Sequence, residues 1–157
     1  MPRAWPWFAL AAGIVVADQV AKWLIQAWFA PGERLGLTGF LNLVLVFNRG
    51  AAFSFLASAP GWQTPLLAGI ALLAAAVVSV LLLRNPSRNL MNGGLALILG
   101  GALGNLIDRL RYGHVVDFLD FHAAGWHWPA FNVADAAITL GAGLLILESF
   151  LRKEPRA

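Results

Sequence analysis

The sequence predicts an all-α membrane protein with four transmembrane helices and a small β-rich element at the outer face of the membrane, between the first and second spans. Hydrophobic residues make up 59% of the chain and charged residues 12%, against about 45–50% and 25% in soluble proteins. The mean hydropathy is +0.71. So few polar residues cannot cover a water-facing surface, so the apolar surface is expected to face lipid.

The apolar residues fall into four runs, each close to the roughly 20 residues that a spanning helix needs. The predicted spans are residues 7–28, 62–83, 90–107 and 131–150, joined on the outer side by connections 29–61 and 108–130. Polar residues and a proline at 84–88 form a tight turn between the second and third spans. We expect one integral membrane domain over residues 1–157, with both termini on the same side.

The first run resembles a secretory signal, because Arg3 precedes an apolar stretch. Asp18 and Lys22 interrupt that stretch, and no clear small-x-small cleavage site follows it. We therefore expect it to remain as a span. In the third span, Gly93, Gly94 and the glycines at 100, 101 and 104 predict close helix packing.

Basic residues set the predicted orientation, because they concentrate on the cytoplasmic side of membrane proteins. The side that holds both termini carries Arg3, Arg84, Arg88, Arg152, Lys153 and Arg156. The opposite side carries arginines accompanied by acidic residues. Both termini are therefore expected in the cytoplasm.

The first outer connection is too apolar for a disordered loop. Residues 35–47 are rich in β-branched and aromatic residues, and they precede the segment 48–55. Open sheet edges are not tolerated in the lipid core. We therefore expect short strands at the membrane surface.

Several function classes fit the sequence poorly. The net charge of +3 suggests nucleic acid, but the basic residues form no stripe, so nucleic-acid binding is not expected. The absence of Cys removes disulfides, thiolate metal sites and a Cys nucleophile. Ser54 lacks the Gly-x-Ser-x-Gly pattern of a serine hydrolase. His114, His122 and His127 lack a zinc-binding pattern, and an interfacial role with neighbouring Trp residues fits them better. No metal or cofactor is expected.

Charges inside the spans are informative, because one at the bilayer centre costs at least about 2.5–3.5 kcal/mol. Asp18 and Lys22 share a helix face at i,i+4 spacing, past the midplane toward the outer side. A structural ion pair is the simpler interpretation, and a part in catalysis is the alternative.

Further acids lie near the outer boundary. Asn105 and Asp108 share a face at the end of the third span, and Asp135 lies one turn inside the fourth. Asp117 lies in the connection between them, where its apolar neighbours favour folding back onto the helices. Two carboxyl groups brought close share a proton, which suits a protease that activates water.

Spacing alone leaves the pair open. Any two of Asp108, Asp117, Asp120 and Asp135 could meet, and Arg109 or Arg111 could instead form structural ion pairs with them. An ion or proton transporter with a relay of aspartates, or an assembly protein whose Asp–Arg pairs hold helices together, would use the same residues.

Five ordered blocks resemble the bacterial lipoprotein signal peptidases, also called signal peptidase II. They are Asp18-Gln19-x-x-Lys22, the run from Asn48 to Phe55, Gly104 to Arg109, Gly113 to Phe118, and Phe131 to Asp135. The blocks span almost the whole chain, and their order makes the resemblance specific. One departure is Ala136, where the family often has Ser.

The resemblance implies that Asp117 and Asp135 are the catalytic pair of an intramembrane aspartic endopeptidase. It implies that Asn48, Asn105, Arg109 and Asn132 lie in or near the substrate site, and that Asp18, Lys22 and Asp108 support its polar architecture. The implied substrate is a diacylglyceryl-modified prolipoprotein, cut just before its lipidated cysteine. The implied location is the bacterial inner membrane, with the active site near the periplasmic face. We expect a monomer in contact with membrane lipid.

Overall fold

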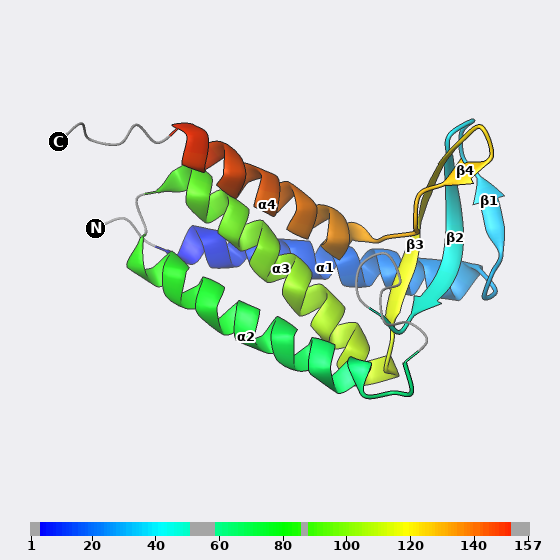
Figure 1. Cartoon of the computed structure of the whole chain (residues 1–157), viewed down its shortest axis with the longest axis horizontal. Coiled ribbons are helices and arrows are strands. Elements are labelled where there is room, and N and C mark those ends of the chain that lie inside the picture. The colour runs from blue at the N-terminus through cyan, green and yellow to red at the C-terminus, as the bar shows by residue number, and fades with distance from the viewer. Residues whose placement is uncertain (1–3, 51–58, 86–87, 152–157) are drawn as a thin grey trace.

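The computed structural model describes residues 4–50, 59–85 and 88–151. Its four helices are α1 (Trp5–Trp28), α2 (Gln63–Arg84), α3 (Asn89–Tyr112) and α4 (Val133–Leu151). All four are long and apolar enough to cross a membrane. Figure 1 shows them side by side, with a small sheet at the end of the bundle opposite the start of α1 and the end of α4. The predicted membrane fold is confirmed.

The third helix is longer than its apolar run. The predicted span ends at residue 107, but α3 continues to Tyr112, where Gly113 ends it with a left-handed φ of 74°. Glycine adopts this conformation without the strain that a Cβ would bring, so it commonly follows the last helical residue. The extra turn carries Asp108 and Arg109 beyond the apolar part of the helix toward the sheet.

Glycines let α3 approach its neighbours closely, as the sequence predicts. A Cβ on Gly101 would lie 2.4 Å from the Ala134 carbonyl oxygen of α4. A Cβ on Gly104 would lie 2.7 Å from an Asp18 carboxylate oxygen on α1. Both distances are shorter than a real Cβ contact, so only glycine fits at these positions. Close packing of α3 therefore places Asp18 beside the start of α4.

The sheet draws strands from both outer connections. Strands β1 (Arg34–Gly36) and β2 (Leu41–Asn48) confirm the strands expected between the first two spans. Strands β3 (Val115–Ala123) and β4 (Trp126–His127) come from the second connection, where no strand was predicted. The sheet is antiparallel, in the order β1-β2-β3-β4. Its register places Asn48 opposite Val115 and Val46 opposite Asp117, with an irregularity between Leu43 and Val46.

One face of the sheet packs on the last turns of α1. Ile25 forms a buried apolar cluster with Leu45, Val116 and Phe118. Because side chains alternate along a strand, Asp117 lies on the other face of β3. An isolated bridge between Leu119 and Phe131 brings the chain before α4 alongside β3. The start of α4 and the middle of β3 therefore lie next to each other.

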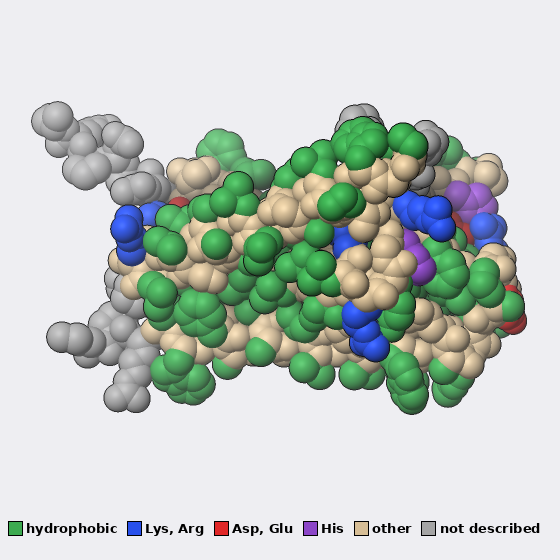
Figure 2. Space-filling view, turned by 90° about the horizontal axis from the view of Figure 1, so that it is seen from below, with side chains coloured by type: hydrophobic (Ala, Val, Ile, Leu, Met, Phe, Trp, Pro, Cys, Tyr) green, Lys and Arg blue, Asp and Glu red, His purple; other side chains and the backbone are tan. Residues whose placement is uncertain are grey.

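The outside of the helices is apolar. Leu72, Leu73 and Leu83 on α2, and Ile146 and Phe150 on α4, are all exposed. Figure 2 shows hydrophobic side chains along the body of the bundle, with charged side chains gathered toward its two ends. This distribution is that of a protein whose helices face lipid.

Candidate active site

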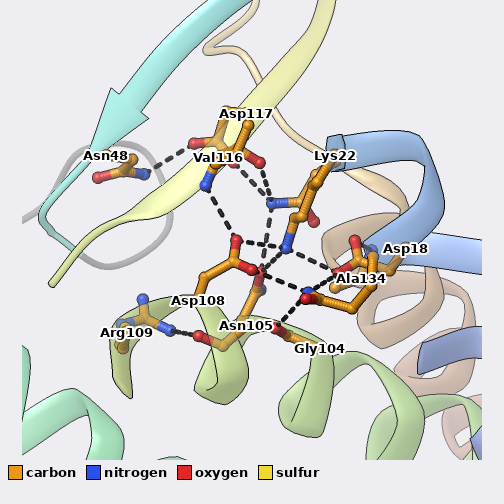
Figure 3. A network of polar contacts seen from close by, with 12 residues as sticks. Asp18, Lys22, Asn48, Gly104, Asn105, Asp108, Arg109, Val116, Asp117 and Ala134 are labelled. Carbon is orange, nitrogen blue, oxygen red and sulfur yellow. Dashed lines mark hydrogen bonds and ion pairs between the residues drawn. The ribbon is translucent and has the colours of Figure 1, made fainter. Parts of the chain in front are cut away.

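Lys22 is the centre of a buried polar network at the sheet end of the bundle (Figure 3). Its Nζ lies 2.8 Å from Asp18, 2.8 Å from Asp108 and 3.0 Å from the Asn105 side-chain oxygen. An ammonium group has three protons to donate, so these acceptors use all of them. Lys22, Asp18 and Asp108 are each at most 2% exposed. The expected Asp18–Lys22 ion pair is present, with Asp108 as a second acidic partner.

The two acids around Lys22 also hold main-chain groups. Asp18 Oδ1 accepts a hydrogen bond of 2.9 Å from the backbone N–H of Ala134. Asp108 Oδ2 accepts one of 3.1 Å from the backbone N–H of Val116. Ala134 directly precedes Asp135, and Val116 directly precedes Asp117. Each of these two acids therefore fixes the backbone next to one member of the predicted pair.

Gln19 is a member of this network to which the sequence reasoning gave no role. Its Nε2 donates to Asp108 Oδ1 at 2.8 Å and to the Gly104 carbonyl oxygen at 3.2 Å. It also lies 3.3 Å from Asp18 Oδ2. Its position in the block Asp18-Gln19-x-x-Lys22 was the available signal. Gln19 ties α1 to α3 and orients Asp108.

Asp117 receives two amide donors. Asn48 Nδ2 donates to its Oδ2 at 3.0 Å, and Asn132 Nδ2 donates to its Oδ1 at 2.7 Å. Burial raises the pKa of Asp117 from 3.8 to about 7, and the charge of nearby Asp135 acts in the same direction. The two amides and the charge of Lys22 oppose this rise in pKa. The result is a carboxyl group that takes up and releases a proton near neutral pH.

Asp135 lies in the first turn of α4 and shares a partner with Asp117. Asn105 Nδ2 donates to Asp135 Oδ1 at 2.7 Å. Asn132, which precedes α4, accepts the Asp135 backbone N–H on its Oδ1 at 2.9 Å, which is the contact of an N-cap residue. The same Asn132 side chain donates to Asp117 and to Asn105 Oδ1. The two carboxyl groups are thus joined through Asn132 and Asn105.

Arg109 lies on the far side of Asn105 from Lys22 in Figure 3. Its guanidinium donates to the Gly50 carbonyl oxygen at 3.1 Å and to the Asn105 carbonyl oxygen at 3.4 Å. Among the residues that the structure describes, neither Arg109 nor Arg111 forms an ion pair with an aspartate. Arg111 instead lies over the Tyr112 ring.

Asp120 belongs to a separate polar group. It accepts from Asn42 Nδ2 at 2.9 Å, contacts His127 Nδ1 at 2.9 Å and lies 3.6 Å from Arg34. Burial raises the pKa of Asp120, but these partners outweigh it and leave the pKa below its usual value. Of the four candidate aspartates, Asp108 pairs with Lys22 and Asp120 with this second group. Asp117 and Asp135 are the two that share Asn132.

The remaining candidates do not gather into a site within the described ranges. There, no group of three His, Cys, Asp or Glu could hold a metal ion. His122 and His127 stack on each other at the sheet edge, and His114 packs against Phe47. Ser54 lies outside the described residues.

The fold and this arrangement define a class: a multi-span membrane protein with a buried network of carboxyl, amide and lysine side chains at one end of its helix bundle. The model of the family described as signal peptidase (SPase) II matches residues 10–151. The chain therefore belongs to the signal peptidase II family and is a peptidase.

Proteins of similar sequence and structure support this family assignment. The chain is 54% identical to a lipoprotein signal peptidase of Paraburkholderia phytofirmans, over 94% of this chain and 86% of the relative. It is 56% identical to one of Ralstonia nicotianae, over 94% and 85%. A solved structure described as a bacterial membrane enzyme matches with a TM-score of 0.83 and 28% identity, covering 97% of this chain and 94% of the other.

Proposed function

We propose that this protein is an intramembrane aspartic endopeptidase that removes the signal peptide from diacylglyceryl-modified prolipoproteins, cutting just before the lipidated cysteine. The observation that carries the proposal is the pairing of Asp117 and Asp135. They come from different elements, share Asn132 and lie among buried partners. The lipoprotein signal peptidases that the chain resembles support the choice of substrate.

In the proposed mechanism, one carboxylate takes a proton from water while the other, protonated, polarises the scissile carbonyl. A pair that shares one proton can do both tasks at once. The pKa of about 7 for Asp117 supports this mechanism, because the group can hold a proton at neutral pH. The two roles are assigned to the pair as a unit.

The surrounding residues take two further roles in this proposal. Asn48, Asn105, Arg109 and Asn132 border the pair and contact the substrate backbone. Asp18, Lys22 and Asp108 support the site. The contact of Asp18 with Ala134 and that of Asp108 with Val116 favour this role over catalysis. No metal or cofactor takes part in the proposed reaction.

The proposed setting is the bacterial inner membrane, with both termini in the cytoplasm and the sheet on the periplasmic side. Arg84 and Arg88 lie at the end of the bundle opposite the sheet, as the positive-inside rule requires of a cytoplasmic end. The enzyme works as a monomer surrounded by lipid, in one domain. The scissile bond of a lipid-anchored signal peptide lies near the outer boundary, at the depth of the carboxyl pair.

The test is cleavage of a diacylglyceryl-modified precursor by purified wild type, Asp117→Asn and Asp135→Asn in detergent. We expect the wild type to cut before the lipidated cysteine, with or without a chelator. Both variants should keep their thermal unfolding temperature within a few degrees and lose cleavage. Near-normal activity in either folded variant would make that aspartate structural and would refute the assignment.

A further inference from the structure

An aromatic groove lies on the sheet, outside the polar network. It is a cavity of about 420 Å³ lined mainly by Phe40, Phe121, Trp126, Trp128 and Phe131. Phe121 stacks on Phe40 with ring centroids 6.2 Å apart and on Phe131 at 5.8 Å. Trp126 meets Trp128 edge to face at 5.8 Å. The reaction proposed above uses none of these side chains.

The groove opens on the same face of the sheet as Asp117. Side chains alternate along a strand, so Asp117, Leu119 and Phe121 share one face of β3. Ala123 continues this face, and Trp126 lies opposite it on β4. Phe131, at the other edge of the groove, directly precedes Asn132, which donates to Asp117. Groove and carboxyl pair are therefore continuous along β3.

On the opposite face of β3, Asp120 and its polar partners hold the strands in place. Asn42 on β2 and His127 on β4 both contact this aspartate, and Arg34 on β1 lies beside it. These contacts tie three strands to β3. These contacts therefore hold together the strands on which the groove lies.

We propose that the aromatic groove binds the part of the substrate that follows the scissile bond, as an extended peptide. This inference rests on the proposed function. Phe121 is four residues from Asp117, or about 13 Å along the strand at ~3.3 Å per residue. An extended chain crosses that distance in about four residues. The groove therefore receives roughly the third to fifth residues after the cut.

The direction in which the bound peptide runs follows from the positions of the helices and the sheet. A signal peptide lies in the bilayer beside the helices, so the chain beyond the cut leaves across the sheet. Figure 1 shows β4 at the end of the molecule farthest from the start of α1. Aromatic side chains with few rotatable bonds give large contact area at low ordering cost, which suits an extended peptide of varied sequence.

The test compares two synthetic diacylglyceryl-modified precursor peptides. They are identical up to the scissile bond, and one ends two residues after it while the other continues for ten. The wild type should cleave the longer peptide with a KM lower by roughly three- to tenfold, the value of one or two aromatic contacts. Trp126→Ala and Phe121→Ala should each reduce this difference in KM between the two peptides.

Trp5→Ala is the matched control. Trp5 is 63% exposed and Trp126 62%, but Trp5 lies at the other end of the bundle, so its loss should leave the effect of peptide length intact. Equal KM values for the two peptides in the wild type would overturn the inference. So would an equal rise for both peptides in Trp126→Ala, which is the result expected if the groove binds lipid. Failure of the wild type to cleave either peptide would refute the proposed function itself.

Discussion

Three asparagine side chains donate hydrogen bonds to the carboxyl pair: Asn48 and Asn132 to Asp117, and Asn105 to Asp135. In each, the amide oxygen accepts from a fixed donor: the Gly50 N–H for Asn48, the Asp135 N–H for Asn132 and Lys22 Nζ for Asn105. Each amide nitrogen is thereby turned toward a carboxyl oxygen of the pair. Amide orientation around Asp117 and Asp135 is therefore set by the backbone and by Lys22.

Asn132→Ala removes the residue that joins the two carboxyl groups. The change deletes the donor to Asp117 and the cap of α4, so kcat should fall by roughly 10- to 100-fold, the value of a hydrogen bond to a charged group. The measurement is kcat in detergent with thermal unfolding in parallel. Asn85→Ala, at the other end of the bundle, is the control and should leave kcat unchanged. Normal kcat in folded Asn132→Ala would show that the bridge is dispensable.

The pH dependence of cleavage follows from Asp117. Asp117 holds a proton below about pH 7 and loses it above, so the form of the pair with one carboxyl group protonated is lost and kcat should fall as pH rises through about 7. The Asn48 amide favours the ionised form of Asp117. Asn48→Ala should therefore raise the pKa and move this limb of the kcat profile to higher pH.

Asn42→Ala is the matched control for that profile, because Asn42 donates to Asp120 instead of Asp117. In Asn42→Ala, the fall of kcat with rising pH should coincide with that of the wild type between about pH 6 and 9. A limb that moves to lower pH in Asn48→Ala would contradict the assigned role of the amide.

Part of the site was predictable from short-range spacing alone. The i,i+4 spacing predicts the Asp18–Lys22 pair, and the i,i+3 spacing places Asn105 and Asp108 on one face, where both contact Lys22. Residue chemistry could not choose Asp117 over Asp120, and the resemblance made that choice. In the structure, the surroundings of Asp117 are formed by residues far from it in the chain. Asn48 and Asn132, for example, both donate hydrogen bonds to its carboxyl group.

At the scale of elements, β3 is the strand that the sequence analysis missed. Residues 115–122 are rich in β-branched and aromatic side chains, which favour strands. However, Asp117 and Asp120 are three residues apart, so they fall on opposite faces of the strand, and both are buried. A strand with a buried carboxyl group on each face shows no simple alternation of apolar and polar residues. The end of α3 was underestimated for a related reason, because Asp108, Arg109 and Arg111 lower the hydropathy of its last turns.

The close contact between α3 and α4 predicts that alanine substitution at Gly101 and at Gly143 will have very different effects on stability. Gly101→Ala would place a methyl group against the Ala134 carbonyl, one residue before Asp135, and should destabilise the protein by roughly 1–3 kcal/mol. It should also lower kcat, because α4 must shift. Gly143→Ala on the same helix pair meets no atom within 4 Å and should be neutral or stabilising.

Thermal unfolding and kcat of both variants check this prediction. Equal stability of the two would show that the helices can separate without cost at Gly101.

At the scale of the whole molecule, polar and apolar residues are separated along the bundle. The buried acids lie at the sheet end, and the helix surfaces between the two ends are apolar. An aspartate relay for ion transport would need carboxyl groups spread across the bilayer. Composition and hydropathy predicted the four apolar helices, because a segment that crosses lipid must be apolar and must satisfy its backbone hydrogen bonds within a helix.

The proposed orientation can be tested because the chain contains no Cys. Thr38, beside β2, and Ser149, near the end of α4, are both exposed. A membrane-impermeant maleimide added to spheroplasts should label Thr38→Cys at once and Ser149→Cys only after permeabilisation. The reverse pattern would place the sheet in the cytoplasm. Cleavage by each variant should be retained, which confirms that both are folded.

The order of the elements along the chain has a consequence for how the enzyme is made. Lys22 and Asp18 neutralise each other within α1, so the first helix can enter the membrane before its later partners exist. Asn48 follows on β2, Asn105 on α3 and Asp117 on β3, whereas Asp135 arrives only with α4, after the other three helices. A nascent chain in which α4 has not yet been made therefore holds only Asp117 of the carboxyl pair. The proposed catalytic pair is therefore complete only once α4 has joined the other three helices.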